Sequence, residues 1–76
     1  MAKKDPTNAQ VAEAFSELGT LYELDGADRF RVSAYRDAAK VIRQCPLSVA
    51  ELTRAGKVTE LPSIGKTSAE KIKVSL

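Results

Sequence analysis

Apolar residues recur along this chain with the spacing of an α-helix rather than with the alternation of a β-strand. Between positions 7 and 24, one helix face carries Val11, Phe15, Leu18 and Tyr22, and Leu21 and Leu24 are expected to widen this apolar face. Thr7 with Gln10 three residues later is the pattern of a capping box, and Gly26 is a natural stop. The sequence therefore predicts a first helix over 7–24 whose apolar face extends to its end.

Three more segments carry helical spacing. The second covers 32–44 and stops before Pro46, the third is a short helix that Ser48 caps and Gly56 ends, and the fourth runs from Lys66 toward the end of the chain. The residues expected to face inward are Tyr35, Ala38, Ala39, Ile42, Val49, Leu52, Ala69, Ile72 and Leu76. This pattern predicts an all-α fold, a compact four-helix domain spanning residues 1–76.

Composition excludes several classes of function. A chain of 76 residues is one small domain, and the absence of His removes Ser–His and Cys–His catalysis and His-based metal sites. A single Cys, Cys45, allows no intrachain disulfide and is expected to be a small apolar residue at a helix end. No apolar run approaches the ~18 residues of a membrane span, and the first residues lack the apolar stretch of a signal peptide. We expect no membrane partner and a monomer, located in the bacterial cytoplasm with the nucleoid, or in the nucleus if the source is eukaryotic.

The net charge of +2 conceals a strong segregation. Residues 1–28 carry a net charge of −4, residues 29–45 carry +4 and residues 46–76 carry +2. A basic face is the electrostatic feature of a protein that binds a polyanion. The alternative is a solvated face whose charges only aid solubility, and charge segregation alone does not separate the two.

The stretch from 59 to 72 is the most informative motif in the chain. Pro62 fixes the entry to a tight turn, and Gly65 is expected to permit the backbone geometry that leads into the last helix. Backbone N–H groups of Gly65, Lys66 and Thr67 at this helix start are predicted to hold one phosphate, with the Lys66 charge beside it. The spacing of Leu61, Pro62, Ile64, Gly65, Ala69 and Ile72 resembles the helix-hairpin-helix motif of sequence-independent DNA-binding proteins, with Ser63 in place of the first Gly of its usual turn. The alternative is an ordinary corner between two helices.

A second motif lies upstream. The segment 30–42, FRVSAYRDAAKVI, resembles the F-x-V-x-A-Y-R-x-A-A segment of family X DNA polymerases, and LYELDG at 21–26 resembles the end of that family's first helix. With the hairpin, the resemblance covers about residues 8–74 and is closer to the bacterial branch. It implies the N-terminal domain of a DNA repair polymerase, here a fragment of a longer enzyme. Such a domain binds gapped, single-stranded or 5′-phosphorylated DNA.

The resemblance also implies individual roles. Lys71 matches a lysine that acts as a 5′-deoxyribose phosphate lyase in several members of the family, forming a Schiff base, with Glu70 or a water moving the proton. This chemistry needs a neutral amine and no organic cofactor. The positions that match DNA- or phosphate-binding residues are Phe30, Arg31, Tyr35, Arg36, Gly65, Lys66, Thr67 and Lys71, and Thr67 replaces a pocket lysine. Backbone carbonyls of Thr59, Leu61 and Ile64 match those that hold Na⁺ or K⁺, whereas Mg²⁺ belongs to the polymerase domain, which this sequence does not contain.

Each of these positions also has a simpler interpretation. Lys71 is equally a solvent-exposed helix lysine, Tyr35 lies on the apolar face and is as compatible with the core as with a pocket, and Phe30 is also an apolar anchor at a helix start. At the level of the whole domain, the alternative is a non-catalytic DNA-binding module or a protein-interaction module that keeps the hairpin. Chemical shifts that respond to a partner protein and not to DNA favour the protein-interaction module.

Overall fold

The computed structural model describes residues 5–76, which form four α-helices and one 3₁₀ turn: α1 (Asn8–Leu24), α2 (Arg29–Gln44), α3 (Val49–Arg54), η1 (Val58–Glu60) and α4 (Lys66–Val74). Within this part of the chain there is no strand, so the prediction of an all-α, four-helix domain is confirmed. None of the helices described is long and apolar enough to cross a membrane.

The first helix begins and ends where the sequence predicts. The Thr7 hydroxyl accepts a hydrogen bond from the Gln10 backbone N–H at 3.1 Å, and the Gln10 side chain accepts one from the Thr7 N–H at 2.9 Å. This capping box satisfies two of the N–H groups that a helix start leaves without partners. After the last turn, Gly26 adopts a φ of 83°, which a glycine reaches without strain.

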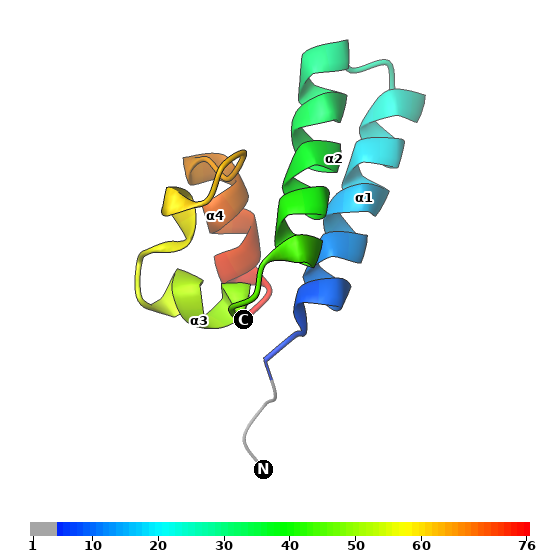
Figure 1. Ribbon diagram of the computed structural model, residues 1–76. Helices are drawn as coiled ribbons and strands as arrows, with labels where there is room; N and C mark the ends of the chain where they lie inside the picture. Colours follow the sequence, from blue (N-terminus) through cyan, green and yellow to red (C-terminus); the bar gives the residue numbers. More distant parts are fainter. Residues whose placement is uncertain (1–4) are drawn as a thin grey trace.

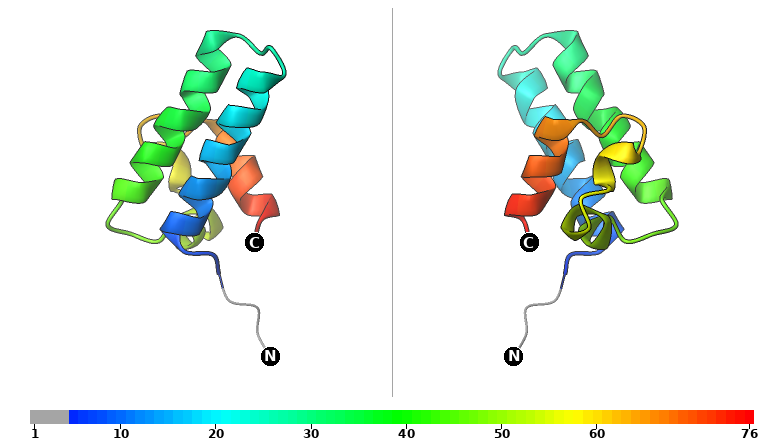
Figure 2. Two further views of the ribbon diagram at one scale, coloured as in Figure 1. Left: turned by 90° about the vertical axis from the view of Figure 1, so that its right-hand side faces the viewer. Right: turned by 90° about the vertical axis from the view of Figure 1, so that its left-hand side faces the viewer.

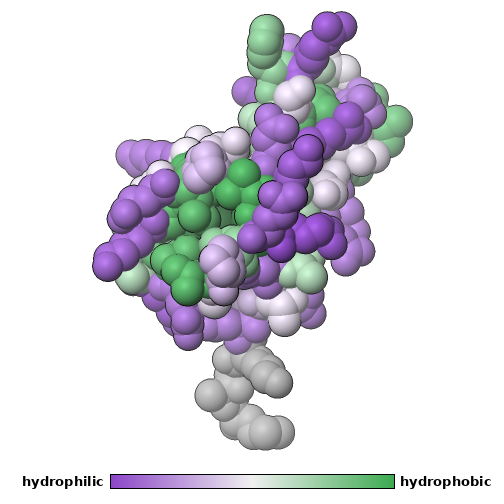
Figure 3. All heavy atoms as spheres, in the orientation of Figure 1, coloured by the Kyte–Doolittle hydropathy of each residue, from purple (hydrophilic) through white to green (hydrophobic). Residues whose placement is uncertain are grey.

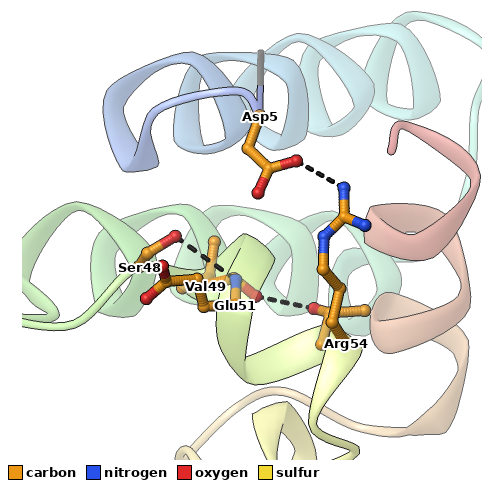
Figure 4. A network of polar contacts seen from close by, with 6 residues as sticks. Asp5, Ser48, Val49, Glu51 and Arg54 are labelled. Carbon is orange, nitrogen blue, oxygen red and sulfur yellow. Dashed lines mark hydrogen bonds and ion pairs between the residues drawn. The ribbon is translucent and has the colours of Figure 1, made fainter. Parts of the chain in front are cut away.

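The second helix begins three residues earlier than predicted, at Arg29 instead of 32. The reason is Asp28, whose carboxylate accepts a hydrogen bond from the Arg31 backbone N–H at 3.0 Å and so caps the helix. Its charge belongs at the positive end of the helix dipole. The third helix is capped as predicted, because the Ser48 hydroxyl accepts from the Glu51 N–H at 3.3 Å (Figure 4).

Two layers make up the domain. Helices α1 and α2 lie side by side as an antiparallel pair, and α3, η1 and α4 cover one side of the lower half of that pair (Figures 1 and 2). Residues from every helix meet between the layers in one core, together with Val58 of η1 and Ile64 of the turn before α4. The core residues are Val11, Ala12, Phe15, Tyr35, Ala38, Ala39, Ile42, Val49, Val58, Ile64 and Ile72. On the face of Figure 1, hydrophobic side chains gather at the surface over the α3–α4 layer beside α2 (Figure 3).

The upper ends of α1 and α2 extend beyond the second layer (Figure 1). Leu21 is therefore 61% exposed and Leu24 is 80% exposed, so the prediction that they widen the buried face is wrong. Phe30, at the start of α2, is 84% exposed, and its interpretation as an apolar anchor is also wrong. The helical period identifies the face that can be buried, but burial also needs a neighbouring element to cover that face.

Asn8 connects the two layers in a way that the hydrophobic pattern does not indicate. Its side-chain amide donates to the backbone carbonyls of Cys45 and Leu47 at 3.1 and 2.7 Å, and its carbonyl oxygen accepts from the Val49 N–H at 2.9 Å. The start of α1 is thereby tied to the connection between α2 and α3. An ion pair between Asp5 and Arg54 links the segment before α1 to the last turn of α3 (Figure 4).

Replacing Asn8 by alanine is expected to lower the free energy of unfolding by about 2 kcal/mol, because three hydrogen bonds are lost at a partly buried site. Urea denaturation followed by circular dichroism measures the change. Asn8→Asp is the matched control, since it can restore the bond to Val49 but not the two donated bonds, and it too is expected to destabilise the domain. Stability equal to that of the natural chain in both variants would show that water replaces these bonds without loss.

Candidate nucleic-acid interface

A pocket of about 410 Å³ opens between α2 and α4, with one wall from α1. Its lining residues are Tyr22, Arg31, Ala34, Tyr35, Thr67, Ser68 and Lys71. Four of the residues proposed from the sequence, Arg31, Tyr35, Thr67 and Lys71, therefore meet in one place although up to 40 positions separate them. Neither of the two motifs alone predicts this pocket, because each supplies only one side of it.

Helical spacing explains how the two sides are built. Arg31 and Tyr35 lie four residues apart on α2, and Thr67 and Lys71 lie four residues apart on α4. Residues at this spacing share a helix face, so each of these pairs presents one cation and one hydroxyl-bearing side chain to the pocket, and α4 adds the hydroxyl of Ser68. The pocket thus combines two positive charges with polar hydroxyl groups, which suits an anionic ligand.

Lys71 and Tyr35 are held between pocket and core. Tyr35 is only 8% exposed and belongs to the hydrophobic core, as its place on the apolar face indicates, and it also borders the pocket. Lys71 is half-buried, with its Nζ atom 5.8 Å from the centroid of the Tyr35 ring. Lys71 is thus only partly exposed to solvent, and its catalytic role stays a prediction.

The hairpin before α4 contains a tight turn. The Ile64 N–H donates to the Leu61 carbonyl at 3.3 Å, Pro62 follows Leu61, and Ser63 has a φ of 66°. Proline second and a positive φ third are the features of a type II turn, where glycine is the usual third residue. Ser63 thus occupies the left-handed position in which the related motif has glycine. Ile64 is 3% exposed and anchors the turn in the core.

Gly65 does not have the role that the sequence predicts for it. Its φ of −91° and ψ of −176° are extended and open to any residue, and a Cβ atom built there meets nothing within 4 Å. The left-handed residue of this hairpin is instead Ser63. Gly65 is the N-cap of α4 and gives it no side-chain hydrogen bond, whereas α1, α2 and α3 all have one. The α4 start therefore presents backbone N–H groups next to open space, beside the exposed Lys66.

Other predicted residues lie outside the α2–α4 pocket. Glu70 is exposed and borders a neighbouring hollow with Lys71 and Thr67. Lys66 borders a hollow of about 210 Å³ between α4 and the end of α3. Arg36 forms a 3.0 Å ion pair with Glu23 across the α1–α2 pair, which occupies its guanidinium.

The predicted cation ligands lie along the hairpin: Thr59 is in η1, Leu61 follows it and Ile64 ends the turn. The Leu61 carbonyl already accepts the bond that closes the turn, and its second lone pair remains for another partner. Binding of Na⁺ or K⁺ by these carbonyls stays a prediction.

Tyr22 and Ser68 are pocket residues that the sequence reasoning missed. Tyr22 packs against the core, as its place on the apolar face of the first helix predicts, but it lines the pocket as well. The sequence offers one signal for Tyr22 as a pocket residue. It lies on the same helix face as Phe15, and the basic segment carries another aromatic residue on its apolar face, Tyr35.

Comparison with protein families matches residues 6–76 to the helix-hairpin-helix domain. No curated protein and no solved structure matches the chain. Domains of this type generally bind DNA, in agreement with a pocket and a hairpin that both carry exposed cations. Because the match covers nearly the whole chain, this protein belongs to the helix-hairpin-helix domain family.

Proposed function

We propose that this chain is the DNA-binding N-terminal domain of a family X DNA repair polymerase that acts in base excision repair. It binds gapped or single-stranded DNA, including the 5′-phosphate at a gap, without sequence specificity. The observation that carries the proposal is the convergence of Arg31 and Lys71 in one pocket, since both match positions of the family's motifs and they come from distant segments. Thr67, which stands where the family has a pocket lysine, lines the same pocket. A phosphate bound there would be met by a cation from α2 and another from α4.

The hairpin supplies a second contact to the DNA backbone. The start of α4 has no side-chain cap, and the dipole of the helix makes that end attractive to a phosphate. Lys66 adds a full charge, and the open space at Gly65 lets a backbone approach closely. The carbonyls of Thr59, Leu61 and Ile64 would hold Na⁺ or K⁺, which would add positive charge on the DNA side of the turn. Phe30, exposed at the start of α2, offers a ring on which a base can stack.

Lys71 supports a second function, that of a 5′-deoxyribose phosphate lyase. Lys71 lines the proposed phosphate pocket, with its Nζ atom 5.8 Å from the centroid of the Tyr35 ring, and a sugar whose 5′-phosphate contacts Arg31 would bring its C1′ toward this amine. The amine would add to the C1′ aldehyde and release water, forming an imine. Loss of a C2′ proton would then break the C3′–O bond, so that the electron pair leaves with the phosphate of the downstream strand. Glu70 or a water molecule would take the proton, and borohydride reduction of the imine tests the step.

The binding proposal predicts the effect of removing single cations. Lys66→Ala and Arg31→Ala should each weaken binding to gapped, 5′-phosphorylated DNA. For each variant, the loss of affinity should be the same for DNA of any sequence. Each should also reduce the slope of log K against log salt by about 1, because one fewer counterion is released. Fluorescence anisotropy with two gapped duplexes of unrelated sequence, at several salt concentrations, measures both effects.

Arg43→Ala is the matched control, because it removes the same charge from the other end of α2, roughly 18 Å from Arg31 along the helix axis. It should change the affinity and the salt slope less than either test variant. If the natural chain fails to bind gapped, 5′-phosphorylated DNA at low salt, the proposal is wrong. Equal losses in all three variants would show a diffuse attraction instead of two defined contacts.

A further inference from the structure

Three aromatic rings form a row that runs from the core to the α2–α4 pocket. The ring centroids of Phe15 and Tyr35 are 6.0 Å apart with an interplanar angle of 25°, and those of Tyr35 and Tyr22 are 5.1 Å apart at 10°. Phe15 and Tyr35 are buried, while Tyr22 is half-buried and reaches the pocket. The row joins α1 to α2, so the Tyr22 ring is fixed by the core behind it.

Both cations of the pocket lie over this row. The Arg31 guanidinium carbon is 5.7 Å from the centroid of the Tyr22 ring, and the Lys71 Nζ atom is 5.8 Å from the centroid of the Tyr35 ring. A cation over the face of an aromatic ring at this distance is attracted to it. Arg31 is otherwise an exposed side chain with many rotamers. In residues 5–76, Arg36 and Arg54 are oriented by carboxylates, whereas Arg31 is oriented by the ring of Tyr22.

We infer that Tyr22 is a positioning residue that holds the guanidinium of Arg31 at the pocket, ready for a terminal phosphate monoester. This inference rests on the proposed function. A terminal phosphate carries close to two negative charges and an internal diester carries one, so a pocket with two fixed cations favours the end of a strand. Holding Arg31 in place before binding lowers the entropy that the side chain loses when the phosphate arrives.

The test compares gapped DNA that carries a 5′-phosphate at the gap with the same DNA carrying a 5′-hydroxyl. The ratio of the two dissociation constants measures phosphate preference and is insensitive to a general loss of binding. Tyr22→Leu should lower this preference about two- to fivefold, whereas Tyr22→Phe, which keeps the ring, should leave it unchanged. In an Arg31→Ala background, Tyr22→Leu should change the preference no further, because the two residues act together.

A second measurement does not depend on DNA or on the folding of Tyr22→Leu. In the natural chain and in Tyr22→Phe, the side-chain protons of Arg31 should be shifted upfield in NMR spectra by the ring beneath them. Ordinary shifts for these protons would overturn the inference, as would an undiminished phosphate preference in a folded Tyr22→Leu. Failure of the proposed function can be told apart from failure of this inference. If the proposed function is wrong, the natural chain does not bind DNA, but the chemical shifts of Arg31 in the free protein still test the contact with Tyr22.

Discussion

Replacing Ile42 by alanine is expected to lower the free energy of unfolding by about 2 to 5 kcal/mol. Ile42 has no exposed surface and lies within the core that all four helices share. Its truncation removes three methyl or methylene groups from a closely packed interior and leaves a cavity that the neighbouring helices fill only in part. A domain of this size has a stability of about 4 to 11 kcal/mol, so this one change removes a large part of it.

Thermal unfolding followed by circular dichroism measures the effect, with an expected fall in Tm of roughly 10 °C or more. Leu24→Ala is the matched control: it is also an aliphatic-to-alanine change on a helix, but Leu24 is 80% exposed. It should change the stability by about 0.5 kcal/mol or less. Similar losses in both variants would contradict the division of the apolar residues into a covered core and an uncovered helix end.

The contrast between Ile42 and Leu24 shows how far the hydrophobic pattern determines the fold. The period of apolar residues and the capping residues locate the helices, because these are local properties of the chain. The pattern does not report that α1 and α2 extend beyond the second layer, since this depends on the length of α4 and on where the hairpin attaches. Leu24 and Phe30 are therefore exposed although both are apolar residues within predicted helical segments or at their ends.

The turn before α4 shows a second limit. Sequence alone indicates a tight turn at Pro62, but not which of the following residues adopts the positive φ. A glycine reaches a positive φ with the least strain, and Gly65 is the glycine nearest to the turn. The structure instead gives the positive φ to Ser63, two residues earlier, because Pro62 sets the register of the turn. This register leaves Gly65 free to serve as an open N-cap.

The pocket itself could be predicted only through the motifs. Arg31, Tyr35 and Lys71 are located by resemblance, and the structure places them around one pocket. Tyr22 could not be located this way, because a tyrosine on an apolar helix face has the same pattern whether it ends in the core or at a pocket. Its role depends on the rotation of α1 against α2, which the close approach at Gly19 permits: a Cβ atom there would lie 3.3 Å from the Arg36 side chain.

Replacing Lys71 by alanine is expected to abolish the covalent adduct that borohydride traps between the natural chain and DNA with an incised abasic site. Borohydride adds hydride to the C=N bond of an imine, so an adduct reports an amine that has reacted with the C1′ aldehyde. Lys71 is half-buried at the pocket, whereas Lys73 on the same helix is exposed and does not line it. Lys73→Ala should therefore retain the adduct, and gel electrophoresis of the reduced mixtures compares the variants.

Lys71→Arg separates the chemistry from the binding. Arginine keeps the positive charge that the phosphate needs but cannot act as the amine nucleophile, because its guanidinium stays protonated. This variant should bind gapped, 5′-phosphorylated DNA nearly as well as the natural chain and still form no adduct. An adduct that survives in both Lys71 variants would assign the reaction to another lysine. If the natural chain binds this DNA but forms no adduct, the domain binds the 5′-phosphate and leaves the sugar intact. The replacement of a pocket lysine by Thr67 would be consistent with that outcome.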